Sequence, residues 1–297
     1  MVTVLITGGT GLVGQLLEQK LTKKGYAVRI LTRNPTQKNQ YYWNIAKNEI
    51  ANTAFENLDY IIHLAGTGIT DKRWTAKRKQ EIIDSRTKTT ELLLNKVKEL
   101  KTTLRGFIAA SAIGYYGANT SQKICLETDK PANDFLGKVC MLWEQASLQF
   151  DKNNIPTTIL RIGIILSSNG GAFTKINTPL AIFPIASGKQ YFPWIHIEDV
   201  TNLCIKAIED SSFVGIYNAV APEKQMNFSF SKLLASKTNK LFIPFGVPSF
   251  ILKLVFGKMY IILTTGRRIS SKKIEKSGYT FVYKKLDKAF DDLVKKL

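Results

Sequence analysis

Short runs of apolar, often β-branched residues alternate along the first half of the chain with longer stretches whose apolar residues recur at helical spacing. The runs predicted to be strands lie at 2–7, 27–33, 41–44, 58–66, 107–111, 157–163 and 215–220. The longest helical patterns cover about 75–101 and 134–151. This alternation predicts an α/β fold built on a Rossmann-type doubly wound parallel sheet with helices on both faces.

The pattern becomes irregular after residue 165. A Gly170-Gly171 pair and a loop rich in proline and isoleucine come first, and Trp194–Val200 then has the pattern of a strand-to-helix junction. We therefore expect residues 1–165 to form the domain built on this sheet, to which 192–220 return. Residues 166–191 and 221–297 are expected to form a smaller α/β lobe.

The most apolar stretch runs from Leu241 to Gly266. Prolines, glycines and two lysines interrupt it, so no uncharged run reaches the roughly 20 residues of a spanning helix. We predict no transmembrane segment. The residues at helical spacing are expected to belong to a helix packed into the domain: Phe250, Leu254, Met259 and Ile262.

The first predicted strand ends in Thr7 and leads into a turn with four glycines within seven positions. These are Gly8, Gly9, Gly11 and Gly14, and a helical pattern follows at once. In such a turn the glycines permit a tight bend and allow a pyrophosphate to approach the backbone at the helix N-terminus. The pattern predicts a dinucleotide site.

The end of the second strand carries information about which dinucleotide binds. Sites for NAD usually have an acidic residue there, which accepts from the ribose 2′-hydroxyl. This chain has Thr32 and Arg33 instead. A guanidinium group binds phosphate in a bidentate manner, so we predict NADP rather than NAD.

Charge is distributed unevenly along the chain. The formal net charge is +19, and from Lys232 to the C-terminus fifteen cations face four acids, 15 − 4 = +11. This balance favours anionic partners. Aromatic residues are not interleaved with the cations as in a base-stacking surface, so no nucleic acid is expected and a solvated basic surface is the simpler interpretation.

Three cysteines without metal-ligand spacing predict no metal site and fit a reducing, cytoplasmic location. No signal peptide is expected, because the N-terminus is itself a core strand.

Several segments together resemble the extended short-chain dehydrogenase/reductase superfamily, also called the NAD-dependent epimerase/dehydratase family. Within it the chain is similar to an atypical subgroup of epimerase-family proteins with a short extra C-terminal domain. The matching segments are collinear and span nearly the whole chain: 7–14, 64–66, 73–74, 85–86, 111–117, 143–144, 161–163, 170–172, 194–197, 266–268 and 278–283.

The resemblance implies an NADP-binding Rossmann domain whose smaller lobe closes over a substrate cleft. It also implies which residues contact the cofactor. These are Gly8, Thr10, Gly11, Leu12, Val13, Gly14, Thr32, Arg33, Leu64, Ala65, Gly66, Glu81, Arg86 and Arg161.

The chain departs from the superfamily at its catalytic residues. The superfamily uses a Ser or Thr with Tyr-x-x-x-Lys, in which the Lys lowers the pKa of the Tyr. Alignment on Gly137-Lys138 places Leu136 at the Tyr position and Cys140 at the Lys position. Ser111 still matches the Ser position.

Other residues near these positions remain candidates for chemistry. Tyr115 or Tyr116 offers a phenol from the loop, although without a Lys its pKa would stay near roughly 10. Cys140 offers either a reactive thiol or a small buried side chain. Lys138 is two positions from the required one and is predicted to point away from the cleft.

Four further side chains are interpreted more simply. Lys175 is either a ligand for an anionic substrate or a surface lysine. His63 lies within an apolar strand and is expected to be a core histidine. His196 and Asp199 are expected to fasten the strand-helix junction.

Two functions follow from these observations. The first is an NADP-dependent oxidoreductase or epimerase, monomeric or homodimeric, acting on a small polar substrate such as a nucleotide sugar, with Ser111 polarising a carbonyl. The second is a non-catalytic or regulatory NADP-binding protein that has lost the Tyr-Lys pair. In a third interpretation, the basic C-terminal quarter binds nucleic acid or an acidic membrane.

Overall fold

A computed structural model describes all 297 residues. Its strands are β1 Thr3–Thr7, β2 Ala27–Thr32, β3 Gln40–Asn44, β4 Glu49–Ile50, β5 Tyr60–His63, β6 Gly106–Ala112, β7 Ser121–Cys125, β8 Thr157–Ile162, β9 Ile164–Ser167, β10 Gly170–Gly171, β11 Ala181–Ile182, β12 Trp194–His196, β13 Gly215–Ala219, β14 Leu241–Phe242 and β15 Arg267–Ile269.

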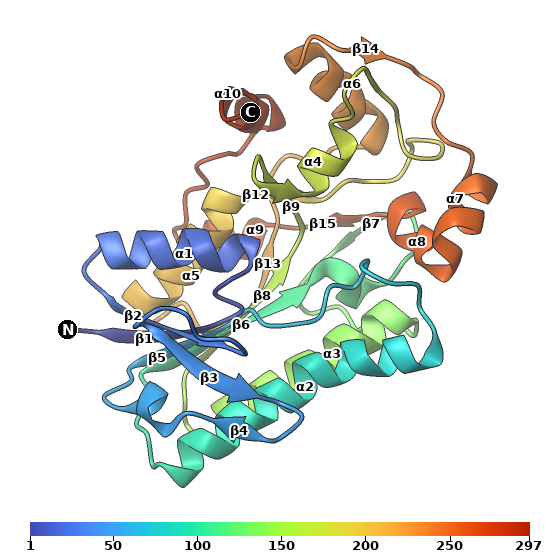
Figure 1. Ribbon diagram of the computed structural model, residues 1–297. Coiled ribbons are helices and arrows are strands. Elements are labelled where there is room, and N and C mark those ends of the chain that lie inside the picture. Colours follow the sequence, from blue (N-terminus) through green and yellow to red (C-terminus); the bar gives the residue numbers. More distant parts are fainter.

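Ten α-helices and three short 3-10 helices connect the strands (Figure 1). The α-helices are α1 Leu12–Lys23, α2 Ala76–Glu99, α3 Phe135–Asp151, α4 Ala172–Ile176, α5 Ile197–Glu209, α6 Asn227–Lys237, α7 Ser249–Phe256, α8 Tyr260–Thr264, α9 Lys272–Lys276 and α10 Leu286–Lys295. The 3-10 helices are η1 Asn52–Phe55, η2 Ile113–Tyr116 and η3 Gly257–Met259.

The predicted parallel sheet is confirmed. Its order is β13-β8-β6-β5-β1-β2-β3-β4, and every neighbouring pair is parallel except β3 and β4. From β1 the chain proceeds to β2 and β3 on one side, then crosses to β5, β6, β8 and β13 on the other. The strand order therefore reverses between β1 and β5, where the ends of parallel strands leave a crevice for ligands.

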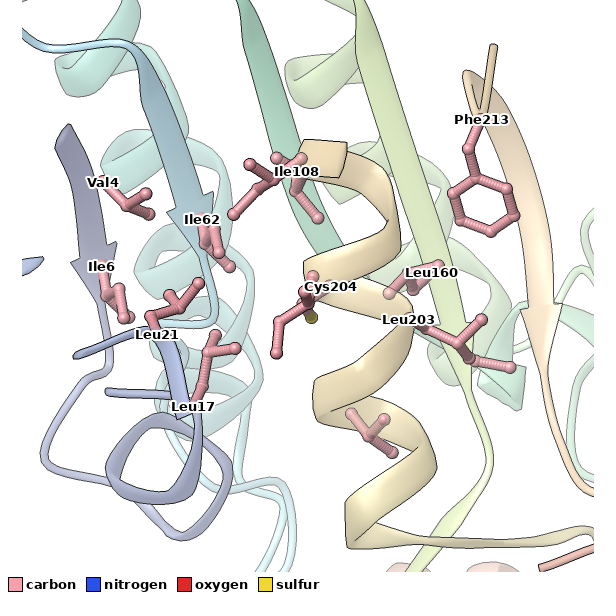
Figure 2. Close-up of a cluster of buried hydrophobic side chains, with 14 of the residues drawn as sticks. Val4, Ile6, Leu17, Leu21, Ile62, Ile108, Leu160, Leu203, Cys204 and Phe213 are labelled. Atoms are coloured by element: carbon pink, nitrogen blue, oxygen red, sulfur yellow. The ribbon is translucent and has the colours of Figure 1, made fainter. Parts of the chain in front are cut away.

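Each face of the sheet has its own hydrophobic core. On one face α1 and α5 pack on the sheet through residues such as Leu17, Leu21 and Leu203 (Figure 2). On the other face α2 and α3 contribute Leu93 and Phe150. Because the strands are covered on both faces, they consist of continuous apolar runs rather than alternating ones.

The segments after residue 163 make contacts that were not predicted. β12 pairs with β9 in a separate three-stranded sheet, so of residues 192–220 only β13 joins the large sheet. β15 pairs with β7, and Ile274 and Phe281 join the core formed by α1 and α5. The C-terminal segment thus returns to the core of the large sheet.

The prediction for the apolar 241–266 stretch was wrong in one respect. The stretch folds into two short helices, α7 and α8, joined by η3, instead of one packed helix. Met259 is buried, but Phe250 is 71% exposed and Leu254 is 77% exposed. None of the helices combines the length and apolar character needed to cross a bilayer.

Candidate functional site

The glycine turn forms an open cradle between β1 and α1. Gly8 has φ +72°, in the left-handed region that favours glycine, and its carbonyl accepts the Gly11 N–H at 3.0 Å. A Cβ on Gly14 would lie 2.6 Å from the Gly9 Cα, so only glycine lets the helix approach the turn this closely. Gly11 begins α1 without a side-chain cap, which leaves the first N–H groups available to an anion.

The other predicted residues of the turn lie where an approaching ligand would meet them. Thr10 is exposed at the tip, while Leu12 and Val13 are half-buried at the start of α1. Leu12 also packs on the hairpin at Gly171, because a Cβ added to Gly171 would lie 3.5 Å from the Leu12 side chain. The β9–β10 hairpin therefore borders the cradle.

The end of β5 lies against the turn, as predicted for Leu64–Gly66. A Cβ on Gly8 would meet the Leu64 carbonyl carbon and the Ala65 nitrogen at 3.0 Å. The Ala65 N–H donates to Thr7 Oγ1 at 3.2 Å, which ties the two strand ends together. These small residues place the backbone at the crevice of the sheet.

His63 is a core histidine, as expected. Its ring is fully buried, and its nitrogens contact Thr7 Oγ1 at 2.7 Å and Thr89 Oγ1 at 3.2 Å. Since Thr89 donates to a backbone carbonyl of α2, it accepts from His63 Nε2–H, and His63 Nδ1 accepts from Thr7. Burial lowers the pKa of His63 to about 3, so the ring stays neutral.

Arg33 lies at the carboxyl end of β2, one strand from the glycine turn. The side chain is exposed, and it takes part in none of the ion pairs or side-chain hydrogen bonds of the molecule. Thr32 beside it is half-buried and accepts the Asn34 N–H at 3.4 Å. The guanidinium group of Arg33 is therefore free for a ligand.

Arg86 and Glu81, both on α2, have different surroundings. Arg86 lies over Gly66: a Cβ added to Gly66 would meet the guanidinium carbon of Arg86 at 3.1 Å. The Arg86 guanidinium group also donates to the Thr67 carbonyl at 3.1 Å. Glu81 is exposed and pairs with Arg78 at 3.3 Å, next to the loop that follows β5. The structure brings Arg86, but not Glu81, to the end of β5.

Ser111 and Arg161 meet in a buried network around Glu144. Ser111 Oγ donates to Glu144 Oε1 at 2.7 Å, and Arg161 binds both carboxylate oxygens at 2.8 Å. The only hydroxyl proton of Ser111 is thus committed to Glu144, which leaves Ser111 no proton with which to polarise a substrate carbonyl. We expected Arg161 to contact the cofactor, but its guanidinium group is 1% exposed and held by protein partners.

The role of Glu144 was not predicted. The Trp143-Glu144 pair was recognised only as a matching motif. A signal was present, however, because an arginine inside an apolar strand requires a buried acid, and Glu144 is the acid within the apolar pattern of α3.

The two loop tyrosines differ in their freedom. Tyr116 is buried, and its hydroxyl donates to Asn218 Oδ1 at 2.6 Å and accepts from Arg161 Nη1 at 2.9 Å. Tyr115 is only half-buried, with the Arg161 guanidinium carbon 3.4 Å from its ring centroid. Burial raises the pKa of both phenols despite the Arg161 charge, so both are protonated at neutral pH.

Leu136 and Cys140, which replace the Tyr-Lys pair, lie beneath the loop. A Cβ on Gly114 would lie 3.4 Å from the Leu136 Cβ and 3.5 Å from the Cys140 Sγ. Leu136 packs in an apolar cluster with Trp74 and Met259. Burial raises the pKa of Cys140 to about 12, so the thiol is protonated and the small buried side chain is the interpretation that fits.

The two lysines considered in the sequence are both on the surface. Lys138 is exposed on α3 while Cys140 faces inward, as the helical spacing predicted. Lys175 is exposed on α4, and the structure gives it no partner in the cleft. A ligand role for Lys175 remains a prediction.

His196 fastens the β12–α5 junction, as predicted, whereas the carboxylate of Asp199 binds the C-terminal segment instead. His196 Nδ1 accepts the Glu198 N–H at 3.2 Å and caps α5, and burial lowers the pKa of the imidazole to about 4. Asp199 accepts from the Tyr279 hydroxyl at 2.7 Å and the Val282 N–H at 2.8 Å. Asp199 therefore holds the returning C-terminal segment on α5.

A cationic pocket near the end of β13 was missed as a site. It is lined by residues of the outer segments, including Tyr191, Glu223, Lys224, Arg267 and Arg268. The Nε atoms of both arginines are buried without a hydrogen-bond partner. Burial and the neighbouring Arg268 lower the pKa of Lys224, so the pocket concentrates positive charge. The Arg267-Arg268 pair was recognised as a motif, but sequence could not show that it faces Lys224.

Comparison with known proteins agrees with this architecture. Residues 4–219 match the NAD dependent epimerase/dehydratase family, and residues 247–293 match a domain of unknown function, DUF1731. An epimerase family protein of Staphylococcus aureus is 32% identical over 297 residues, 98% of each chain. The epimerase family protein YfhF of Bacillus subtilis is 33% identical over 308 residues, covering 98% of this chain and 97% of its own.

Solved structures show the same fold. The human epimerase family protein SDR39U1, crystallised with NADPH, superposes with a TM-score of 0.89 at 27% identity, with 100% of both chains covered. A nucleoside-diphosphate sugar epimerase of Corynebacterium glutamicum gives a TM-score of 0.79 at 27% identity, covering 97% of this chain and 57% of that one. With its glycine cradle at the switch point of a parallel sheet, this chain belongs to the NAD dependent epimerase/dehydratase family.

Proposed function

We propose that the chain binds NADP(H) and uses it to reduce a carbonyl group on a small anionic substrate. The observation that carries the cofactor part is the open cradle at Gly8–Gly14 with the unpaired Arg33 at the neighbouring strand end. The free N–H groups of α1 suit a pyrophosphate, and Arg33 suits a 2′-phosphate. The NADPH in the structure of the human relative supports this choice.

The protonation of the loop tyrosines favours reduction over oxidation or epimerisation. When bound, the cofactor supplies a hydride, and a carbonyl that accepts it needs one proton to become an alcohol. Tyr115 is half-buried at the loop after β6 and is protonated at neutral pH, so it can donate this proton. Because burial raises its pKa, almost no phenolate is present to act as the base of the reverse reaction. Ser111, which donates to Glu144, positions Arg161 beneath Tyr115 through that carboxylate.

The cations around the cationic pocket favour an anionic substrate group beside them, although the pocket itself, with a volume of about 10 Å³, has room for no more than one water molecule. Arg267 and Arg268 leave buried Nε–H groups unpaired, and an anion would satisfy them. Lys224 adds a third cation next to them. A phosphorylated sugar or a nucleotide sugar has both the anionic group and the carbonyl or hydroxyl carbon that the proposed reaction requires.

A second candidate is a non-catalytic NADP(H)-binding protein. It is favoured by the replacement of the Tyr-Lys pair with Leu136 and Cys140, and by the commitment of the Ser111 proton to Glu144. In that case the cradle and the cations around the pocket bind their ligands, but no proton donor completes a reaction.

Turnover assays separate the two candidates. Purified protein with NADPH is assayed against a panel of aldehydes, ketones and phosphorylated keto sugars, by loss of absorbance at 340 nm. We expect turnover with anionic carbonyl compounds, at least a tenfold loss of kcat in Tyr115→Phe, and a raised KM in Arg268→Gln. The control Tyr26→Phe, just before β2 at the opposite edge of the sheet, keeps full activity. Tight NADPH binding without turnover on the panel would establish the second candidate.

A further inference from the structure

The exposed apolar side chains of the molecule concentrate on and before α7. Between residues 241 and 256 eight large apolar side chains are exposed: Leu241, Phe245, Val247, Phe250, Ile251, Leu254, Val255 and Phe256. Phe245, at 81%, is among the most exposed. In Figure 1 α7 lies at the outer edge of the molecule, beyond α8 and away from the large sheet. We use the name α7 patch for the exposed apolar side chains of α7 itself: Phe250, Ile251, Leu254, Val255 and Phe256.

The α7 patch has a fixed position, because α7 is anchored to the rest of the molecule by a buried side chain and by hydrogen bonds. Leu252 is buried, and the Arg73 guanidinium group donates to the Leu254 and Val255 carbonyls at 3.0 and 2.8 Å. At 100° per residue, Phe250 and Leu254 lie about 160° from the buried Leu252, on the opposite face of the helix. Ile251 and Val255 lie between that face and Leu252. The contacts of α7 thus present four apolar side chains to solvent together.

The segment that contains the α7 patch carries positive charge only. Residues 224–274 include ten lysines and arginines and no Asp or Glu. Lys253 on α7 and Lys258 in η3 are exposed and belong to none of the ion pairs of the molecule. An apolar helix face bordered by unpaired lysines is typical of helices that lie in the interface of an anionic bilayer.

We propose that the α7 patch binds to the surface of anionic lipid bilayers, with Phe250 and Leu254 inserted among the acyl chains and Lys253 and Lys258 at the headgroups. Charge decides against a second copy of this chain as the occupant. A two-fold interface through α7 would bring the same unpaired lysines of both copies together, with no acidic residue of the segment between them. Nucleic acid would use the lysines but leave the apolar face exposed.

Vesicle co-sedimentation tests this proposal with the full chain. The probes are vesicles of phosphatidylcholine with 30% phosphatidylglycerol and vesicles of phosphatidylcholine alone. We expect at least tenfold stronger binding to the anionic vesicles and a marked loss in 0.5 M salt. Phe250→Ser/Leu254→Ser and Lys253→Glu/Lys258→Glu should each weaken this binding at least tenfold. The matched controls are Val282→Ser, an exposed apolar residue outside the patch, and Lys152→Glu, an exposed lysine on the α3 C-cap; neither should change it.

Three results would overturn the proposal. The first is equal or absent binding to both kinds of vesicle. The second is binding that survives Phe250→Ser/Leu254→Ser, which would show that unspecific electrostatic attraction accounts for it without insertion of these side chains. The third is a dimer in light scattering that this double variant dissociates while vesicles are not bound, which would assign the patch to a second copy. NADPH affinity and the melting temperature show that each variant is folded.

Discussion

The crevice has two ends, the glycine turn and the end of β6, and they differ in how far their residues match the motifs of the family. At the glycine turn, backbone geometry forms the site: Gly8 is left-handed, Gly14 packs on Gly9, and the first N–H groups of α1 are open. At the end of β6, side chains form the site, and here Leu136 and Cys140 stand where the superfamily has its Tyr and Lys. A cofactor cradle can therefore persist when the groups that do the chemistry change.

At the end of β6, a network of polar side chains takes the place of the superfamily's Tyr-Lys pair. Glu144 receives Ser111 and Arg161, and Arg161 in turn supports Tyr115 and Tyr116. Ser111, Glu144, Arg161 and Tyr116 are buried and joined by hydrogen bonds, and the half-buried Tyr115 packs on Arg161. We call the glycine turn the cofactor end and the end of β6 the chemical end. The comparison predicts that the stability of the chemical end depends on charged side chains, whereas the geometry of the cofactor end depends on glycines, which have no side chain.

The largest expected effect is at the Glu144–Arg161 pair. Glu144→Ala leaves a buried guanidinium group unpaired, which should cost about 3–5 kcal/mol of unfolding free energy. Chemical denaturation measures this loss. The control Glu91→Ala removes an exposed carboxylate from α2 and should change stability by less than about 0.5 kcal/mol. If the free energy of unfolding of Glu144→Ala lies within about 1 kcal/mol of the wild-type value, the network does not stabilise the chemical end.

Acid should destabilise the fold through its only two histidines, His63 at the cofactor end and His196 at the β12–α5 junction. Both folded pKa values, about 3 for His63 and about 4 for His196, lie below the unfolded value of 6.5, so unfolding takes up protons below pH 6.5. Stability is complete above pH 6.5 and falls as the pH decreases, by up to about 2.7 kcal/mol per pH unit for two protons.

Urea unfolding between pH 7 and 5 measures this slope. His196→Asn, which retains a capping side chain for α5, should remove about half of it and leave the contribution of His63 at the cofactor end. A free energy of unfolding that stays constant from pH 7 to 5 would contradict the assignment of buried, neutral rings.

At the cofactor end, Gly14→Ala should weaken NADPH binding at least tenfold, about 1.4 kcal/mol, because the added Cβ forces the turn away from α1. Fluorescence titration of NADPH measures the effect. Gly25→Ala is the control: Gly25 lies just after the other end of α1, has φ +83°, and a Cβ added to it would meet no atom within 4 Å, so the substitution affects stability but not affinity. Equal affinities of the Gly14→Ala and wild-type proteins would disprove the cradle.

The smallest expected effect concerns Cys140. Its buried, protonated thiol should not react with a disulfide reagent in the folded protein at pH 8, and the other two cysteines are buried as well. Thiol titration should therefore find three reactive groups only after denaturation. Rapid modification of Cys140 that NADPH prevents would instead restore a chemical role for it.

Local pattern predicted the large sheet because buried parallel strands are continuous apolar runs, and the glycine turn because its geometry depends on residue type alone. The α7 patch could not be predicted, since an apolar run does not reveal which of its residues face solvent. The pairing of β15 with β7 joins Arg268 to residues some 140 positions earlier, near Ile124. No local pattern contains such a contact, and the cationic pocket depends on it.

Cofactor discrimination by Arg33 tests the central claim most directly, because it depends on one exposed side chain and not on folding. Isothermal titration of NADPH and NADH against wild type, Arg33→Glu and the control Lys38→Glu is the measurement. We expect wild type and Lys38→Glu to bind NADPH at least tenfold more tightly than NADH, and Arg33→Glu to lose this preference with its NADH affinity unchanged. Equal losses for both cofactors in Arg33→Glu, or a wild type that prefers NADH, would contradict an NADP(H) site at this cradle.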